Sequence, residues 1–99
     1  MIPATFGYPV FMRQLKDLSG IGPAMLKDFE MLGVHSVDEL AEKDPHRLYD
    51  ELCSLTHARQ DPCVLDTFTC AVAQAQDPHL PPEKRNWWYW SRIRKASTR

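Results

Sequence analysis

Two glycines enclose an isoleucine in Gly20-Ile21-Gly22, the stretch of this sequence best suited to bind an anion. Glycine adopts backbone angles that other residues resist, so the chain can turn sharply and leave amide N–H groups unpaired where the next helix begins. Such amides attract phosphate. We expect the three amides to hold one phosphate, with Lys27 adding a positive charge one turn later. The alternative is a tight turn that only buries Ile21.

Positive charge is concentrated at the C-terminal end of the chain. Residues 1–82 contain six Lys and Arg against twelve Asp and Glu, whereas residues 83–99 contain six Lys and Arg against Glu83 alone. The body should therefore repel a polyanion that the tail attracts. We expect Arg92, Arg94 and Lys95 to help the glycine turn hold a nucleic-acid backbone, a contact that reads no base sequence.

Four aromatic residues stand together in Trp87-Trp88-Tyr89-Trp90. This is too much apolar surface to leave in water. Two outcomes remain open. The favoured one is that the tail folds back over the cysteine-bearing face of the preceding helix, while the basic end beyond Ser91 projects freely. In the other, the rings stack on single-stranded bases or contact a partner protein.

The three cysteines are an odd number, which fits reduced thiols in a reducing compartment. On a helix over residues 62–76, Cys63 and Cys70 share one face, and Cys63 lies in the first turn, where the helix dipole favours a thiolate. Cys53 and His57 complete a candidate thiol or metal site, but the set lacks the C-x2-C pair of structural zinc sites. Burial as small apolar side chains is the favoured role, so we expect no cofactor.

Catalysis has little support in the sequence. The four histidines are scattered, and no serine or cysteine accompanies them in a recognisable order. The pairs Asp38-Glu39 and Asp50-Glu51 are adjacent, so their side chains point to different sides of a helix. We therefore predict that the protein is not an enzyme.

The positioning elements are predicted to be helices, because apolar residues recur with helical spacing. The predicted helices span residues 9–17, 23–32, 37–42, 45–53 and 62–76.

Start and stop signals bound most of these helices. Gly33 is placed to end the second helix, and Ser36 with Glu39 forms a capping box that begins the third. Asp44 and Asp61 each precede a proline and are predicted to begin the fourth and fifth helices.

The length of 99 residues, with 43% hydrophobic content, indicates one domain with one core. We divide the chain into an extended arm (1–8), a helical domain (9–76), and a segment (77–99) comprising a proline-rich linker, the tryptophan cluster and a basic tail that is disordered past about Arg94. No apolar run is long enough to span a membrane and no secretory signal is visible, so we expect a cytoplasmic protein with no membrane contact.

The order Leu18-x-Gly-Ile-Gly-x-Ala24, followed by an apolar helix and Leu32-Gly33-Val34, resembles the helix-hairpin-helix motif. In that motif the hairpin amides usually hold a phosphate of the DNA backbone. A second hairpin is predicted over residues 54–60, but it contains no glycine, so we expect a degenerate, structural turn there.

From Leu15 to about Trp90 the chain resembles the small bacterial helix-hairpin-helix family described as "pathogenicity locus", some of whose members are mitomycin-resistance-like. The resemblance implies an all-α fold, a compact five-helix tandem helix-hairpin-helix (SAM-like) domain with an aromatic C-terminal tail. It implies little about activity. The residues that carry it are Gly20-Ile21-Gly22, Gly33-Val34-x-Ser36-Val37-x-x-Leu40, Asp44-Pro45-x-x-Leu48-Tyr49, the three cysteines and Trp87-Trp88-x-Trp90.

The leading functional hypothesis is a non-catalytic, DNA-associated accessory module that binds backbone phosphate without sequence specificity. The first alternative is a protein-interaction module on the same scaffold that has lost its affinity for DNA. A weaker alternative is a thiol- or metal-dependent sensor. The oligomeric state is left open.

Overall fold

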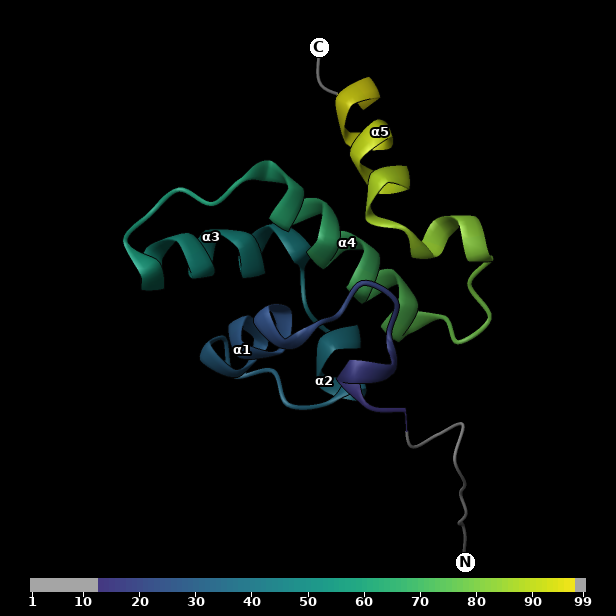
Figure 1. Cartoon of the computed structure of the whole chain (residues 1–99), viewed down its shortest axis with the longest axis horizontal. Helices are drawn as coiled ribbons and strands as arrows, with labels where there is room; N and C mark the ends of the chain where they lie inside the picture. The colour runs from purple at the N-terminus through teal and green to yellow at the C-terminus, as the bar shows by residue number, and fades with distance from the viewer. Residues whose placement is uncertain (1–12, 98–99) are drawn as a thin grey trace, which may run out of the picture.

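The computed structural model describes residues 13–97, and within this range the chain is helical and contains no strand (Figure 1). The predicted all-α class is thus confirmed. The elements are η2 (Leu15–Asp17), α1 (Pro23–Met31), α2 (Val37–Ala41), α3 (Pro45–Thr56), α4 (Pro62–Gln76), η3 (Pro82–Arg85) and α5 (Trp87–Ser97).

Four of the five predicted helices, over residues 23–32, 37–42, 45–53 and 62–76, are present as α1 to α4, whereas α5 was not predicted to be a helix. The extended arm and most of the first predicted helix lie outside the described residues. Within them, Gln14 is extended (φ −103°, ψ 160°), and only the single 3-10 turn η2 precedes the hairpin. At the other end, α5 continues to Ser97, so the prediction of disorder past Arg94 was wrong.

The central element is α4, which packs against α2, α3 and α5 (Figure 1). Its apolar side chains meet those of α1, as in the contact between Phe29 and Phe68, whose ring centroids lie 5.6 Å apart. Both rings are fully buried, together with Leu40 and nearly all of Leu52. Burial of these large side chains supplies most of the driving force for folding.

Predicted caps begin three of the helices. The carboxylates of Asp44 and Asp61 each accept a hydrogen bond from the amide two residues later, at 2.9 and 2.8 Å. The Ser36 hydroxyl accepts the Glu39 amide at 3.1 Å. The return bond differs from the prediction, because the Glu39 carboxylate accepts the His35 amide (2.7 Å) instead of the Ser36 amide.

Two helices end in a left-handed residue. Gly33 (φ 77°) follows α1, and the Val34 amide donates to the Phe29 carbonyl at 2.9 Å. This confirms Gly33 as the predicted stop. The exposed His57 (φ 54°) takes the equivalent position after α3, which extends three residues past its predicted end. A residue with a side chain is strained at a positive φ angle, whereas glycine adopts it easily.

The tail folds back onto α4, the outcome favoured from the sequence. The Arg94 guanidinium binds the carboxylate of Asp66 through two hydrogen bonds of 2.8 and 3.0 Å. The Trp90 indole donates to the Lys84 carbonyl at 2.8 Å, and the Cys70 thiol donates to the same oxygen at 3.6 Å. Trp90, early in α5, lies near Cys70, and Arg94, one turn later, lies near Asp66, which precedes Cys70 in α4. The two helices are therefore antiparallel.

Among residues 13–97, no helix has both the length and the apolar character needed to cross a membrane.

Candidate functional site

The hairpin between η2 and α1 presents two exposed glycines. Gly20 has φ 82°, a left-handed angle that favours glycine, whereas Gly22 has φ −102° and ψ −172°, an extended conformation that any residue adopts. The side chain of Ile21 points into the core and keeps 8% of its surface exposed. The turn thus buries Ile21 and leaves both neighbouring glycines facing solvent.

The amides of the hairpin differ in their hydrogen bonding. The Ile21 amide donates to the Leu18 carbonyl at 3.3 Å, so one of the three predicted donors is used internally. For the Gly20 and Gly22 amides, no partner exists among the described residues. The start of α1 also lacks a side-chain cap. The amides of two exposed residues, at and just before the N-cap of α1, are therefore without an internal partner and could bind an anion.

A buried glutamine of α4 fixes the hairpin. The Gln74 side chain accepts the Ser19 amide at 2.9 Å and donates to the Ser19 carbonyl at 3.0 Å. It also donates to the Cys70 sulfur at 3.5 Å and keeps only 3% of its surface exposed. Sequence reasoning missed Gln74. The available signal was a polar residue on the apolar face of a helix, between Val72 and Ala75.

Arg13 has a structural role beside the hairpin. Its guanidinium donates to the carbonyls of Gln74 (3.0 Å) and Ala75 (3.3 Å), at the C-terminal end of α4. A cation there satisfies carbonyls without a helical partner and complements the negative end of the helix dipole.

The charges along α1 are mixed. Lys27, the predicted phosphate contact, is exposed on this helix, as is Glu30. Asp28 is partly buried, and this burial raises the pKa of its carboxyl group, while the positive charge of Lys27 lowers it. The first helix after the hairpin therefore offers little net attraction to a polyanion.

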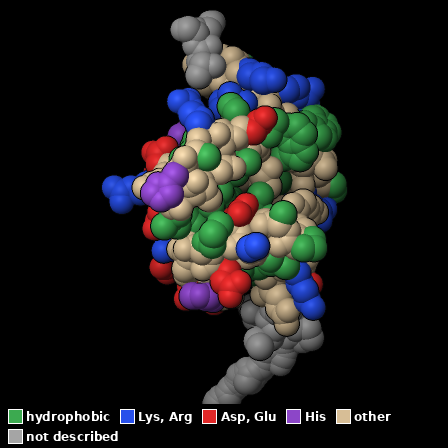
Figure 2. Space-filling view, turned by 60° about the vertical axis from the view of Figure 1, so that its left-hand side comes forward, with side chains coloured by type: hydrophobic (Ala, Val, Ile, Leu, Met, Phe, Trp, Pro, Cys, Tyr) green, Lys and Arg blue, Asp and Glu red, His purple; other side chains and the backbone are tan. Residues whose placement is uncertain are grey.

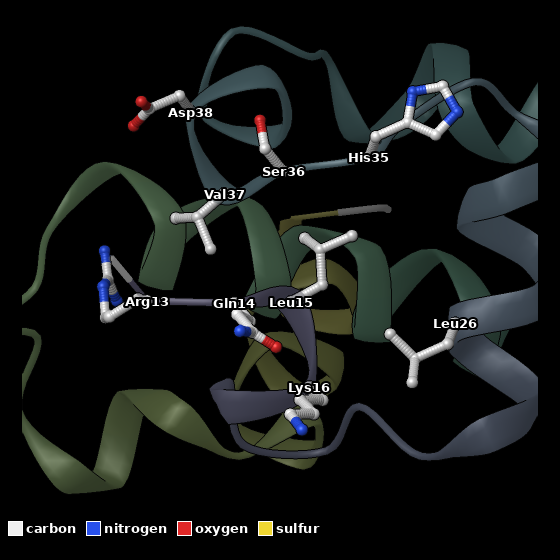
Figure 3. A pocket seen from close by; sticks show the side chains of 9 residues that line it. All are labelled: Arg13, Gln14, Leu15, Lys16, Leu26, His35, Ser36, Val37 and Asp38. Carbon is white, nitrogen blue, oxygen red and sulfur yellow. The ribbon is translucent and has the colours of Figure 1, made fainter. Parts of the chain in front are cut away.

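A cavity of about 540 Å³ lies between η2, α1 and the start of α2 (Figure 3). Figure 3 shows Leu15 and Val37 pointing into it from opposite sides, with Leu26 at one end. Lys16 and Asp38 also line it, so the cavity has both charged and apolar walls. Neither glycine of the hairpin lines this cavity.

The tail residues predicted to bind nucleic acid have different surroundings. Arg94 is held by Asp66, and this hydrogen bond raises the pKa of its guanidinium. The prediction that the basic end projects freely is therefore wrong for Arg94. Arg92 is exposed and lies over the ring of Trp88, 4.7 Å from its centroid. Lys95 is exposed on the last turns of α5.

The aromatic cluster divides into two pairs. Tyr89 and Trp90 are partly buried and make an edge-to-face contact, with ring centroids 5.1 Å apart. Trp87 and Trp88 keep 43% and 44% of their surface exposed. The folded-back tail thus covers only part of the cluster.

The three cysteines, all free thiols, occupy separate environments. Cys53 is partly buried, and its sulfur accepts the Gln60 amide at 3.3 Å. Cys63 is exposed, and its hydrogen bond to Asp61 raises the thiol pKa, which opposes the effect expected from the helix dipole. Cys70 is buried, which also raises its thiol pKa. In the part of the chain that the structure describes, no group of three or more His, Cys, Asp or Glu is placed to hold a metal ion.

The predicted second hairpin uses several of its amides internally. The amides of His57 and Ala58 donate to carbonyls at the end of α3, at 3.3 and 3.1 Å. The Tyr49 hydroxyl donates to the Gln60 carbonyl. This turn therefore offers fewer open donors than the Gly20–Gly22 hairpin.

The sequence of this chain matches a known protein family. Residues 11–96 match the model of a family described as "Pathogenicity locus". The chain is 36% identical over 81 residues to the mitomycin resistance protein McrB of Streptomyces lavendulae, covering 82% of this chain and 73% of the relative. No solved structure matches the chain significantly. The matched range includes the hairpin and α5 except for its last residue, Ser97.

Proposed function

The chain belongs to the pathogenicity locus family, and we propose that it is a non-catalytic, cytoplasmic module that binds the phosphate backbone of DNA without sequence specificity. One observation carries this proposal. The amides of the exposed residues Gly20 and Gly22 have no partner within residues 13–97, while Gln74 holds the preceding Ser19 peptide in place.

A fixed turn lowers the entropic cost of binding. Loops that become ordered on binding lose conformational freedom, and this loss subtracts from the affinity. Here the two hydrogen bonds between Gln74 and Ser19 order the turn in advance. Hydrogen bonds from amides to a charged phosphate are also stronger than those to neutral acceptors.

Charge limits the affinity that we expect. Asp28 and Glu30 lie on the same helix as Lys27, so the hairpin alone binds weakly. The cations of α5, among them Arg92, supply additional attraction to a polyanion. Binding should weaken with salt, with a slope of about −0.9 in log affinity against log salt for each phosphate neutralised on duplex DNA.

The test is a fluorescence anisotropy titration of labelled DNA at several salt concentrations, with the Gly22→Ala variant. A Cβ at Gly22 meets no atom within 4 Å, and its extended angles suit alanine, so this variant should fold normally. The added methyl group would stand beside the amides and keep a phosphate away. We expect affinity to fall about tenfold, the loss of roughly one hydrogen bond to a charged group.

A matched pair of lysine variants separates a local contact from a general charge effect. Lys27→Ala and Lys43→Ala remove the same charge from exposed positions, but only Lys27 lies one turn beyond the hairpin. The proposal requires the larger loss from Lys27→Ala. Equal affinity for wild type and Gly22→Ala, or no binding near physiological salt, would contradict it.

The name of the relative from Streptomyces lavendulae suggests a cellular readout. We propose that this chain likewise supports survival in the presence of mitomycin. Cells expressing wild type should then outgrow cells expressing Gly22→Ala at equal protein level. Equal survival of the two kinds of cell would show that resistance to mitomycin does not depend on the hairpin.

A protein-interaction role is the second candidate, favoured by the twelve acidic residues of the body. It predicts that DNA fails to bind in the titration above. The thiol or metal sensor has less support, because Cys53, Cys63 and Cys70 lie in separate environments and two of them have raised thiol pKa values.

A further inference from the structure

We propose that the first turns of α5 form a stacking platform for unpaired bases, so that the nucleic acid bound by this chain is single-stranded. The platform consists of Trp87, Trp88 and Arg92. This inference rests on the proposed function, because it names the class of nucleic acid that the module takes.

The first support is exposure. Trp87 and Trp88 are among the few large apolar side chains that keep more than two fifths of their surface in water, at 43% and 44%. They are neighbours in the chain, and the remaining aromatics of the cluster, Tyr89 and Trp90, are partly buried and contact each other. Consecutive residues of a helix point about 100° apart around its axis, so Trp88 shares a face with Arg92, one turn away, and Trp87 adds exposed aromatic surface beside that face. Exposed aromatic surface of this kind is typical of an interaction site.

The second support is rigidity. The platform stands on a helix that the Arg94 guanidinium fastens directly to Asp66 of α4. The Trp90 indole also binds the Lys84 carbonyl of η3, which accepts the Cys70 thiol of α4. The exposed indoles are therefore held by a folded helix and not by a loose tail. The entropic cost of ordering the protein when a base stacks on these indoles is therefore small.

The third support is charge. Residues 83–97 contain five Lys and Arg against Glu83, and Figure 2 shows basic side chains beside hydrophobic ones at the C-terminal end of the molecule. Arg92 lies over the Trp88 ring at 4.7 Å from its centroid. A planar guanidinium on an indole extends the stack and brings a positive charge to it.

These features together select a nucleic acid strand over an acidic peptide. An acidic peptide could form ion pairs with the Lys and Arg side chains, but it does not carry a planar ring with each negative charge to stack on the indoles. Each nucleotide of a single strand offers both a phosphate and a planar base. In a duplex the base faces are covered by their neighbours, so a duplex could use only the cations. Stacking contributes about 1–3 kcal/mol per base.

The platform and the hairpin are linked through α4. Gln74 holds Ser19 of the hairpin and also donates to Cys70, and Cys70 donates to the Lys84 carbonyl that receives the Trp90 indole. Cys70 and Gln74 are separated by one turn of α4, about 6 Å along its axis. The hairpin and the segment that carries the platform are therefore anchored to neighbouring turns of α4.

The experiment compares three ligands of equal length on the full chain: single-stranded oligothymidine, the same strand without bases, and a duplex. The abasic strand keeps the phosphates but cannot stack. We expect the oligothymidine to bind about tenfold tighter than the abasic strand, the equivalent of one stacked base. It should also quench tryptophan fluorescence, whereas the abasic strand should not.

Side-chain variants locate the effect. Trp87→Ala and Trp88→Ala should each weaken oligothymidine binding about tenfold and leave abasic binding unchanged. Leu55→Ala, which alters another exposed apolar residue (49%) on α3, is the matched control and should change neither. Trp88→Phe should retain most of the affinity while Trp88→Leu does not, because only phenylalanine keeps a ring.

The failure of this inference is distinguishable from the failure of the proposed function. Equal binding of all three ligands, with losses from Gly22→Ala but not from the tryptophan variants, would overturn the platform and leave the hairpin proposal standing. If none of the three ligands binds, both the platform inference and the proposed DNA-binding function are wrong. Self-association that disappears in Trp88→Ala, without any base-dependent binding, would assign the surface to a second copy of the chain and overturn the inference.

Discussion

Arg94 of α5 holds the buried carboxylate of Asp66 on α4 through two hydrogen bonds of 2.8 and 3.0 Å. The Asp66 side chain keeps 2% of its surface exposed, and that of Arg94 keeps 28%. A carboxylate so deeply buried is costly without a partner. The C-terminal helix is therefore part of the folded domain, and the platform that it carries has a fixed place.

Replacing Arg94 should destabilise the whole fold. Arg94→Met keeps the aliphatic part of the side chain but leaves Asp66 buried without its cation. We expect the free energy of unfolding to fall by about 2–3 kcal/mol, less than for a completely buried pair because Arg94 is partly exposed. Urea denaturation followed by circular dichroism measures this. The double variant Asp66→Leu with Arg94→Met should recover most of the loss, and a failure to recover would show that the pair is not the cause.

The contact between Gln74 and Ser19 gives a second prediction. Gln74→Leu removes both bonds to the Ser19 peptide and leaves its N–H and C=O groups without that partner. We expect a loss of about 2 kcal/mol in unfolding free energy and weaker binding of DNA, because the hairpin is no longer held. Gln76→Leu is the matched control. Gln76 is an exposed glutamine of the same helix that makes one bond to the Ala41 carbonyl, and its loss should cost well under half as much.

His57 is expected to yield a stabilising substitution. It holds a left-handed angle (φ 54°) after α3, where glycine is preferred. His57→Gly should raise the free energy of unfolding by about 0.5–1 kcal/mol. Gly33→Ala, at the equivalent position after α1 with φ 77°, should lower it by about 1 kcal/mol. Thermal unfolding of the two variants checks the pair, and a destabilised His57→Gly would refute the prediction.

Asp61 should control the reactivity of the Cys63 thiol. The hydrogen bond and negative charge of Asp61 raise the thiol pKa, so less thiolate is present at mildly alkaline pH. Asp61→Asn removes the charge, keeps a good helix cap, and should speed alkylation of Cys63. Mass spectrometry of the alkylated peptide reports the rate. Cys70 is buried and serves as the internal reference, since it should react only upon unfolding. A slower reaction in the variant would contradict the role of Asp61.

The same aspartate should affect the acid stability of the protein. Its hydrogen bonds at the start of α4, chiefly with the Cys63 amide, lower its pKa below the ordinary value of 3.8. A group whose pKa is lower when folded stabilises the protein above its unfolded pKa, and this contribution is lost as pH falls through the folded pKa. Wild type should therefore be more stable than Asp61→Asn above pH 3.8, and the difference should shrink below it. Urea titrations across this range test the sign, and a constant difference would refute it.

The helix ends show how much local sequence can predict. Asp44, Asp61 and Gly33 were assigned from short-range signals and take those roles, because a cap or stop depends on atoms within a few residues. The helix over 87–97 was missed for the opposite reason. Its aromatic and basic residues do not specify a helix alone, and packing on α4 overrides this weak preference.

The candidate site divides in the same way. The glycine turn was visible in the sequence, because the need for a left-handed angle at Gly20 is local. The partners Gln74 and Asp66 were not visible, because they lie 55 and 28 residues from the groups that they bind. The sequence patterns therefore predicted the hairpin amides as hydrogen-bond donors, but not the distant residues that hold the hairpin and α5 in place.

By itself, the sequence determined the all-α class, the ends of most helices and the exposed glycine turn, since each depends on residues within one or two turns. Only the tertiary structure decided which amides and cations are already engaged. The Ser19 peptide is bound by Gln74 and Arg94 by Asp66, while the Gly20 and Gly22 amides have no partner in the described residues. The physical reason is that a hydrogen bond or ion pair between distant segments forms only after burial of the apolar core brings them together.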